Sequence, residues 1–515
     1  MKKHFIRTRK VRWGSIAVIL TLLVITVTVL ANAVFSTLAR RYSWYTDMNG
    51  EANYDVTEDC YTLLDNFFSS LSARGFAPKA EIIFCTVEEE IAKEHTQQNL
   101  YHAATSLAKR FPEQITVSCH DIWTNPNTVR DYATTFNPET GENEDTFIQS
   151  TSVIIVSGDY HRVYTLEEFY VFEDGNTQKV WAYNGEKKLA AGIMRAVDPD
   201  EHVVCLTSNH GETFTDPEIL YLLDDAGYTM KKIDLYKDEI PAGCDLIISY
   251  NPTTDLVEDS LSETSEVEIL EQFLSVEGNS FWVFLKNGTP KLSNFEAFLG
   301  GWGVDFAYHT AGERSYRYMV QDPSQSLTSD GYTIYGEAVT SGHAAELIRG
   351  LDRKVVFKNA TAMKAAQGFV NNGDGSFTKG GRTMYSLYTG GANAVSWANG
   401  ELVDLADDAI LMSLTEQKGA AGGSSYVGVI ASVDFSAEDF LQSAVYGNTD
   451  VLLRSLHNVG KEYVPEGLTI KPFSSQDIST VTTRQMLVWT VTLSVVPALI
   501  IAVTATVILI RRRRA

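Results

Sequence analysis

The stretch HVVCLTSNHGETFTDPEILYLLDDAGYTMKKIDL (202–235) decides the fold, because it holds a strand, a helix and a second strand in direct succession. HVVCLTS (202–208) is a short apolar run of the kind that is buried in a parallel sheet. Asp216 is placed to cap the next helix with Pro217 at its first position, and Gly227 ends that helix. This succession predicts an α/β fold.

The same succession continues downstream. DLIISYN (245–251) and FWVFL (281–285) are further buried-type strands, and SEVEILEQFLSV (265–276) between them has helical spacing. YVGVIASVDF (426–435) returns to a buried strand, which we expect to complete the sheet begun at residue 202. Residues 311–425 are rich in Gly, Ser and Thr and indicate hairpins and loops.

An earlier segment repeats the pattern less clearly. AEIIFCTV (80–87), ITVSCHDI (115–122) and SVIIVSG (152–158) are strand-like, and helical spacing occurs at 56–75 and 99–111. Strands that alternate with helices favour a mainly parallel sheet here as well. RVYTLEEFYVF (162–172) and KVWAYN (179–184) alternate enough to predict antiparallel additions to it.

Two long uncharged segments lie near the ends of the chain. Residues 13–39 contain IAVILTLLVITVTVLANAVF, and residues 486–510 read MLVWTVTLSVVPALIIAVTATVILI. Each has about the 20 apolar residues that a bilayer crossing needs. The first segment also has features of a cleaved signal peptide, including Ala31-Asn32-Ala33, but its apolar stretch is longer than usual for one. We therefore expect two transmembrane helices.

Charge is distributed unevenly along the chain. Basic residues without any acid occupy 1–12, and Arg511–Arg514 follow the second apolar segment. Removing these ten positive charges from the net charge of −23 leaves −33 on the remainder. Because basic residues stay on the cytoplasmic side, we expect both termini in the cytoplasm and 40–485 outside the cell membrane. Nucleic acid would be repelled by so acidic a segment.

These observations predict the following organisation: a cytoplasmic tail (1–12), a transmembrane helix (13–39), a first external α/β domain (40–197), a second external α/β domain (198–465) with a β-rich insertion at about 311–425, a linker (466–485), a second transmembrane helix (486–510) and a short basic tail (511–515). The five cysteines form no CxxC pair, and we expect small buried side chains rather than a disulfide framework.

Motifs for catalysis are missing from the sequence. It contains no G-x-x-x-x-G-K-[ST] loop, no G-x-S-x-G elbow and no HExxH helix, and we predict no catalytic residue, no metal site and no cofactor. The best polar candidates are His210 and Glu212, which follow one strand, and Asn251, which follows another. Open α/β sheets bind ligands at that edge, so these three are candidate ligand-binding residues. The alternative is that His210 and Glu212 only shape the turn.

The order of these pieces resembles the GldG family, the membrane auxiliary proteins of ABC-2-type export systems. SNHGE (208–212) is similar to the family's Gly-His-Gly-Glu stretch, and EIPAGCDLIISYNPTTDL (239–256) to its next strand segment. VGVIASVDFSAEDFL (427–441) and VVPALIIAVTATVILIRRRR (495–514) resemble the family's last strand and its last span. Glu277-Gly278 stands where the family commonly has Gly-Gly, and VTSGHAAELIRGL (339–351) lacks the family's proline.

The resemblance implies a glutamine-amidotransferase-like or flavodoxin-like second domain and a partnership. A separate ABC ATPase and a multi-span permease would carry out transport, and this chain would hold an external binding or assembly domain beside them. That domain would bind a substrate, an envelope component or another subunit. Two alternatives remain open: a stand-alone surface binding protein and an unrecognised hydrolase.

Overall fold

The computed structural model describes residues 55–473 apart from 174–175, 215, 260–263, 392, 396–401 and 406, together with five residues between 23 and 34. Those five, Leu23, Thr26, Val27, Leu30 and Val34, are helical. The two predicted transmembrane helices otherwise lie outside the described residues, as do both basic ends. Among the residues that are described, no helix is long and apolar enough to cross a membrane.

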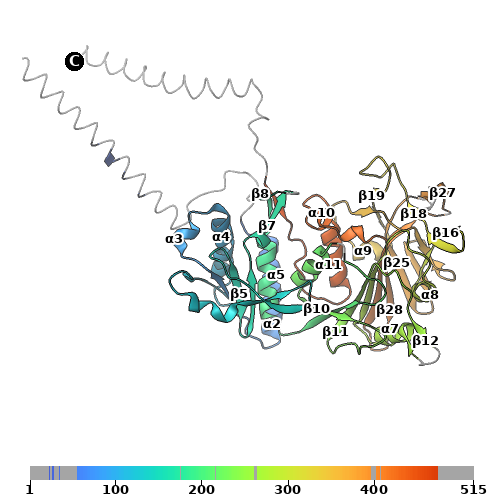
Figure 1. Cartoon of the computed structure of the whole chain (residues 1–515), viewed down its shortest axis with the longest axis horizontal. Coiled ribbons are helices and arrows are strands. Elements are labelled where there is room, and N and C mark those ends of the chain that lie inside the picture. Colours follow the sequence, from blue (N-terminus) through green and yellow to red (C-terminus); the bar gives the residue numbers. More distant parts are fainter. Residues whose placement is uncertain are drawn as a thin grey trace, which may run out of the picture. The chain divides into compact units, whose positions relative to one another are not determined.

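The first lobe, residues 55–198, is built on a four-stranded sheet (blue to green in Figure 1). Its strand order is β2-β1-β5-β6, and α5 packs on β1, β5 and β6 while also contacting α2 and α4. The elements are α2 (Glu58–Ala73), β1 (Ala80–Phe84), α3 (Glu88–Ile91), α4 (His95–Arg110), β2 (Ile115–Cys119), β3 (Thr134–Asn137), β4 (Glu142–Asp145), β5 (Val153–Ser157), β6 (Tyr160–Tyr164), β7 (Tyr170–Glu173), β8 (Asn176–Tyr183) and α5 (Gly185–Val197).

The prediction of a mainly parallel sheet is wrong for this lobe. The expected antiparallel additions are confirmed for β6, which is antiparallel to β5, whereas β7 and β8 pair antiparallel with each other in a separate sheet. β1 and β2 are parallel, but β5 is antiparallel to β1. The reason lies between β2 and β5, where the chain forms short 3₁₀ turns and the β3–β4 hairpin instead of a crossover helix. A parallel neighbour needs such a crossover, whereas an antiparallel strand can enter without one.

The second lobe, residues 202–470, has the predicted α/β architecture. Five parallel strands stand in the order β10-β9-β11-β14-β29. Numbered along the chain, this is the order 2-1-3-4-5, which reverses between the first and third strands. The expected return of the chain at residues 426–435 is confirmed, because β29 pairs with β14. The strands are β9 (His202–Thr207), β10 (Tyr228–Ile233), β11 (Cys244–Tyr250), β14 (Ser280–Phe284) and β29 (Ser424–Ile430).

Helix α6 connects β9 to β10, α7 lies between β11 and β14, α8 and α9 lie between β14 and β29, and α10 and α11 follow β29. The bounds of these helices are α6 (Glu218–Asp225), α7 (Glu266–Leu274), α8 (Ser293–Gly301), α9 (Gly342–Leu347), α10 (Glu438–Leu441) and α11 (Asn448–Asn458). α6 begins one residue later than the sequence predicts: Pro217 is at its N-cap, and Asp216 accepts a hydrogen bond from the Glu218 amide at 3.1 Å.

Antiparallel strands extend the sheet beyond β29. β28 pairs with β29, and β25, β24 and β23 follow in that order. The region contains β15 (Val304–Phe306), β16 (Tyr308–Ala311), β17 (Arg314–Arg317), β18 (Met319–Val320), β19 (Thr333–Tyr335), β20 (Glu337–Ala338), β21 (Val356–Lys358), β22 (Met363–Ala365), β23 (Val370–Asn371), β24 (Ser376–Lys379), β25 (Arg382–Thr389), β26 (Asn393–Val395), β27 (Leu402–Asp404) and β28 (Ile410–Lys418). Two further short strands, β12 (Glu258–Asp259) and β13 (Thr264–Ser265), precede α7, and β30 (Lys471–Pro472) ends the described chain.

The turn between β28 and β29 contains the Gly-rich stretch GAAGGSS. The Glu277 carboxylate accepts hydrogen bonds from the amides of Ala421 at 2.6 Å and Gly423 at 2.8 Å. A side chain therefore fixes a loop whose composition alone is typical of a flexible segment.

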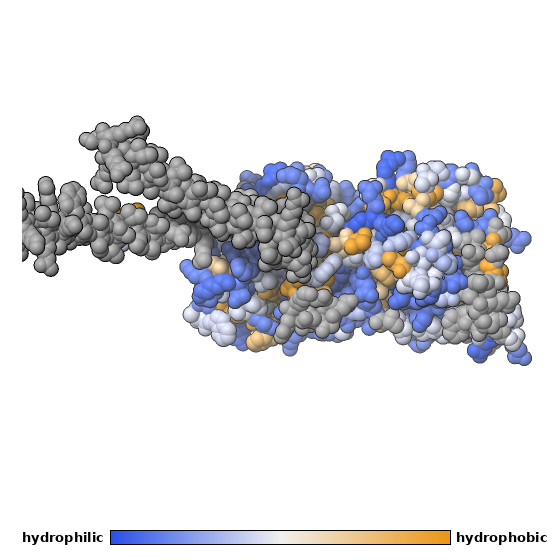
Figure 2. All heavy atoms as spheres, turned by 90° about the horizontal axis from the view of Figure 1, so that it is seen from above, coloured by the Kyte–Doolittle hydropathy of each residue, from blue (hydrophilic) through white to orange (hydrophobic). Residues whose placement is uncertain are grey.

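The two lobes belong to one compact unit that ends at Lys471. Two ion pairs join them, each at 2.7 Å: the buried pair of Arg162 in β6 with Asp224 in α6, and the partly buried pair of Lys188 in α5 with Asp225 in α6. The core is apolar, and the four cysteines Cys60, Cys85, Cys205 and Cys244 are buried in it with free thiols, whereas Cys119 is half-buried. Figure 2 shows a mostly hydrophilic face with small, scattered hydrophobic patches.

Candidate functional site

The loops that follow β9 and β11 meet at the carboxyl edge of the parallel sheet. The carbonyl of His210, in the first loop, accepts hydrogen bonds from the amides of Thr253 and Thr254, in the second, at 2.8 Å each. β9 and β11 are the first and third strands of the lobe, so this is the point where the strand order reverses and where such sheets bind ligands. The sequence-predicted residues therefore belong to one region.

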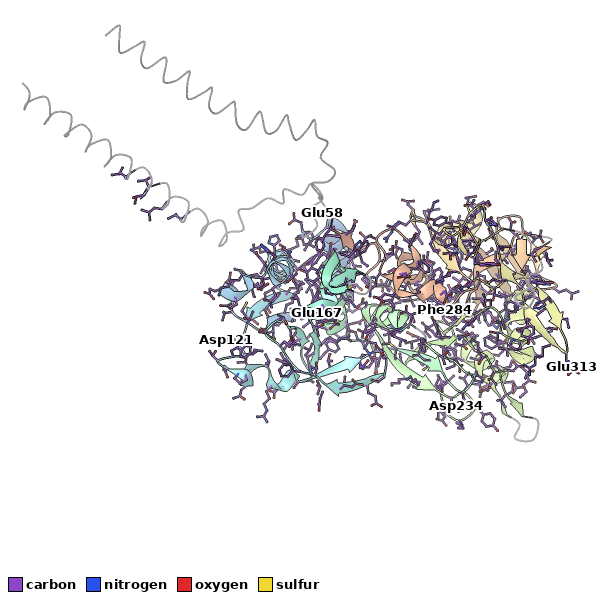
Figure 3. All side chains as sticks on the ribbon, turned by 45° about the horizontal axis from the view of Figure 1, so that its top comes forward. Glu58, Asp121, Glu167, Asp234, Phe284 and Glu313 are labelled. Atoms are coloured by element: carbon purple, nitrogen blue, oxygen red, sulfur yellow. The ribbon has the colours of Figure 1, made fainter. Side chains whose placement is uncertain are left out.

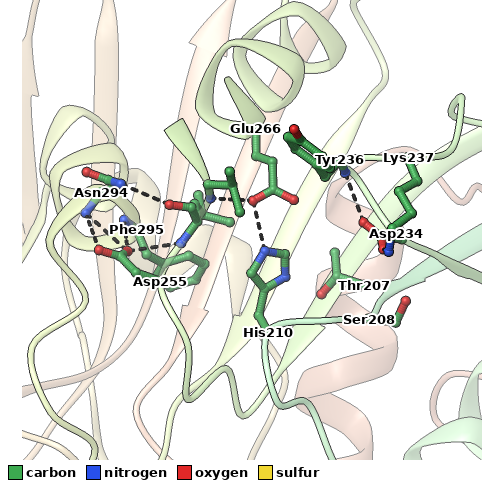
Figure 4. Close-up of polar contacts among 12 residues, drawn as sticks. Thr207, Ser208, His210, Asp234, Tyr236, Lys237, Asp255, Glu266, Asn294 and Phe295 are labelled. Carbon is green, nitrogen blue, oxygen red and sulfur yellow. Dashed lines mark hydrogen bonds and ion pairs between the residues drawn. The ribbon is translucent and has the colours of Figure 1, made fainter. Parts of the chain in front are cut away.

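His210 lies at the centre of this region, and its side chain is buried between two carboxylates. Its Nε2 is 2.9 Å from Oε2 of Glu266, and its Nδ1 is 3.3 Å from Oε1 of Glu212. Figure 4 shows the contact with Glu266, which comes from the first residue of α7. Glu266 is 0% exposed and His210 is 2% exposed.

The charges of this triad follow from its contacts. Burial by itself disfavours a charged imidazole, but the hydrogen bonds to Glu212 and Glu266 outweigh it and raise the pKa of His210 to about 10. Burial likewise opposes charge on Glu212, yet its hydrogen bonds with His210 and Thr207 lower the pKa of that carboxyl. At neutral pH the imidazole is therefore a cation that donates to both neighbours.

Glu212 also fixes the shape of the β9 loop. Its Oε2 accepts from the His210 amide and its Oε1 from the Thr207 hydroxyl, both at 2.6 Å. The loop turns through left-handed backbone at Asn209 and Gly211. A Cβ on Gly211 would lie 2.0 Å from the Thr253 hydroxyl oxygen, so glycine permits the close approach of the two loops.

Asn251, the third predicted residue, follows β11 directly in left-handed backbone with φ of 58°. Its amide donates to the Phe284 carbonyl at 2.9 Å, which ties the end of β11 to β14. Its side chain is 5% exposed, and Oδ1 has no hydrogen-bond partner in the described part of the chain. Asn251 shares the sheet edge with His210 and Glu212, and the loops, rather than its own side chain, connect it to them.

Glu266 is the member of the site that sequence reasoning missed. It lies 56 residues after His210, at the start of a helix that the sequence does predict. Acids are common in the first turn of a helix, because the positive end of the helix dipole stabilises a carboxylate there. Glu266 follows the N-cap Ser265 and fits this ordinary pattern. Its position gave no signal that the side chain turns inward to a histidine.

The occupied imidazole limits the chemistry of this site. A histidine that acts as a general base or binds a metal needs a ring nitrogen with a free lone pair. Both nitrogens of His210 instead face carboxylates. Within the described ranges, no cluster of three or more His, Cys, Asp or Glu side chains is placed to hold a metal ion.

A pocket of about 410 Å³ lies beside the triad. Thr207, Ser208 and Glu212 line it from the β9 end, Phe214 and Lys232 contribute other walls, and neither His210 nor Asn251 reaches it. The Ser208 hydroxyl donates to the Ile233 carbonyl at 3.0 Å, so it is held by the sheet.

Comparison with known proteins gives no further guide: no protein-family model matches this chain, and no curated protein is significantly similar to it.

Proposed function

We propose that this chain is a non-enzymatic accessory subunit of an ABC-2-type export system, resembling the GldG family. Its two predicted transmembrane helices pack on a multi-span permease that works with a separate ABC ATPase. Residues 40–485 then form an extracytoplasmic binding and assembly region, whose second domain is glutamine-amidotransferase-like, and an envelope component is its further partner.

One observation carries the non-enzymatic part of the proposal. At the carboxyl edge of the sheet, where an amidotransferase-like fold has its reacting groups, His210 has both ring nitrogens engaged by Glu212 and Glu266. A histidine held in this way shapes the loop and does not activate a nucleophile. The strand order 2-1-3-4-5 supports the proposed fold relationship.

Purification from the native membrane tests the proposal. The full chain, tagged at its C-terminus and expressed at its native level, is solubilised in a mild detergent and its partners are identified by mass spectrometry. A P-loop ATPase and a multi-span permease in stoichiometric amounts are expected. A second two-pass membrane protein of the same cell, treated identically, controls for chance recovery.

The stand-alone surface binding protein is the alternative. It predicts recovery of the chain without any transporter subunit at native expression, and that result would overturn the accessory-subunit proposal. A hydrolytic activity that is lost in His210→Ala, with folding intact, would instead support the hydrolase.

A further inference from the structure

A pocket of about 680 Å³ lies between the two lobes, away from the His210 triad. The β3–β4 hairpin, β6, β7 and the start of α5 line it from the first lobe, and α6 and α10 line it from the second. Its volume falls in the range of sites that bind small molecules. Figure 3 labels Glu167, one of the acids on its wall.

Lys187 distinguishes this pocket. It lies in the first turn of α5, lines the pocket and is 6% exposed. Its two cationic neighbours are paired, Lys188 with Asp225 and Arg162 with Asp224. Lys187 itself makes no hydrogen bond or ion pair with any residue that the structure describes.

A buried ammonium group without a partner is unfavourable. Burial lowers the pKa of Lys187 and outweighs the nearby Asp225, which raises it. Buried charges in proteins are normally paired or neutralised, because the loss of hydration costs free energy. Acids lie near Lys187 without pairing with it directly, and an anion bound in the pocket would supply that direct partner.

The N-terminus of α5 provides the other half of an anion site. The cap residue, Asn184, makes no side-chain hydrogen bond to the helix, and its buried Oδ1 has no partner among the described residues. Asn184 and Lys187 line the same pocket. A helix N-terminus attracts negative charge through its unpaired amides and its dipole, and the 13-residue α5 is long enough for this effect.

Acids from both lobes also line the pocket and restrict what can bind. Glu218 of α6 lines the pocket and is close enough to Lys187 to raise its pKa, and Asp145, Glu167 and Glu168 line it from the first lobe. A ligand with negative charge alone would be repelled by these carboxylates. A ligand that carries an ammonium group as well would match both sides. Phe136 and Tyr221 offer apolar surface for its body.

We propose that this pocket binds a small zwitterion of the amino-acid or dipeptide class, with its carboxylate at Lys187 and the N-terminus of α5 and its ammonium group at Glu218. This site does not depend on the proposed partnership with an exporter. It would give the external region a ligand whose binding holds the two lobes together.

Thermal unfolding of the purified full chain in detergent, followed by tryptophan fluorescence, tests the proposal. Free amino acids and dipeptides are added one at a time, and the same compounds blocked as N-acetyl amides serve as uncharged controls. At least one zwitterion is expected to raise the Tm, and its blocked form is not. Failure of every zwitterion to shift the Tm would overturn the proposal.

Variants assign the contacts. We expect Lys187→Met and Glu218→Gln each to weaken the binding of the active zwitterion by about tenfold or more, and Lys187→Arg to retain part of it. Lys187→Met removes an unpaired buried charge, so the variant should fold. Lys79→Met, at an exposed position of the same lobe, is the matched control.

Inorganic phosphate is the remaining probe. Stabilisation by phosphate that depends on Lys187, without any response to a zwitterion, would identify a simple anion site and overturn the zwitterion assignment. Binding of a zwitterion that is unchanged in Lys187→Met would place the ligand elsewhere and overturn it too.

Discussion

His210 is a buried cation whose two counter-charges come from different parts of the chain. Glu212 is two residues away and also caps the loop, whereas Glu266 arrives from α7. Removing the imidazole would leave two carboxylates buried without a positive partner. The triad therefore joins the β9 loop to α7, and this connection depends on the single side chain of His210.

Replacing His210 by glutamine should destabilise the protein by about 3–5 kcal/mol at neutral pH, because it leaves buried charges uncompensated. The effect should depend on pH. Since the folded pKa of about 10 exceeds the ordinary 6.5, the stability that the imidazolium contributes is complete below pH 6.5 and is lost as the pH rises through 10. Urea unfolding of wild type and His210→Gln at several pH values measures this.

The lowered pKa of Glu212 has the opposite sign: its contribution is complete above the ordinary 4.5 and is lost as the pH falls through the folded value. The difference between the two proteins should be largest between pH 4.5 and 6.5. His343→Gln, which removes an exposed partner of Glu346, should have a much smaller effect. An equal loss in both variants, or a difference that does not shrink towards pH 10, would contradict the account of the triad.

Sequence could identify part of this site. His210 and Glu212 follow a strand and are close in the chain, so their proximity is a local property that spacing reveals. Glu266 is brought to His210 by the packing of α7 across the sheet edge, and Lys187 is buried because the second lobe covers it. The contact of Glu266 with His210 and the burial of Lys187 both arise from tertiary packing, and no local pattern in a single sequence reveals them.

At the level of elements, the strands of the second lobe were predictable because buried strands read as apolar runs between turn signals. The first lobe was harder. β5 has the same apolar character as a parallel strand, and only the missing crossover before it reveals its direction. The GAAGGSS turn has a composition typical of a flexible segment, yet the distant Glu277 accepts hydrogen bonds from its amides.

Helix α8 depends on a cap from outside its own sequence. Its N-cap residue, Leu292, has no capping side chain, and Asp255 instead accepts from the amides of Asn294 and Phe295 at 2.9 Å each (Figure 4). Asp255→Ala should therefore destabilise the protein by about 0.5–2 kcal/mol, as the loss of an N-cap does.

Asp255→Asn provides the graded control in the same urea-unfolding measurement. It keeps one acceptor oxygen but loses the negative charge at the helix N-terminus, so its cost should be smaller, about 0.3–1 kcal/mol. If the asparagine variant is as unstable as the alanine variant, charge rather than hydrogen bonding dominates the cap. If neither variant loses stability, Asp255 does not cap α8.

For the whole molecule, the ion pairs between the two lobes decide whether the lobes unfold together. Arg162 and Asp224 have side chains that are 5% and 6% exposed, and Arg162 Nη1 lies within 2.8 Å of both carboxylate oxygens. They are 62 residues apart and belong to different lobes, Arg162 to β6 and Asp224 to α6. Because both side chains are buried, separating the lobes would leave each charge without its partner, which costs free energy.

A double-mutant cycle measures this coupling. Arg162→Met and Asp224→Ala should each destabilise the chain by about 3–5 kcal/mol, because each leaves one buried charge alone. The double variant should lose clearly less than the sum of the two, since no unpaired charge remains. The exposed pair Arg74 and Asp200, at 2.8 Å, should lose less than about 1 kcal/mol in the same cycle. Urea unfolding of the wild-type full chain should be a single transition. Two separate transitions, or additive losses of unfolding free energy in the Arg162 and Asp224 variants, would show that the lobes unfold independently of this pair.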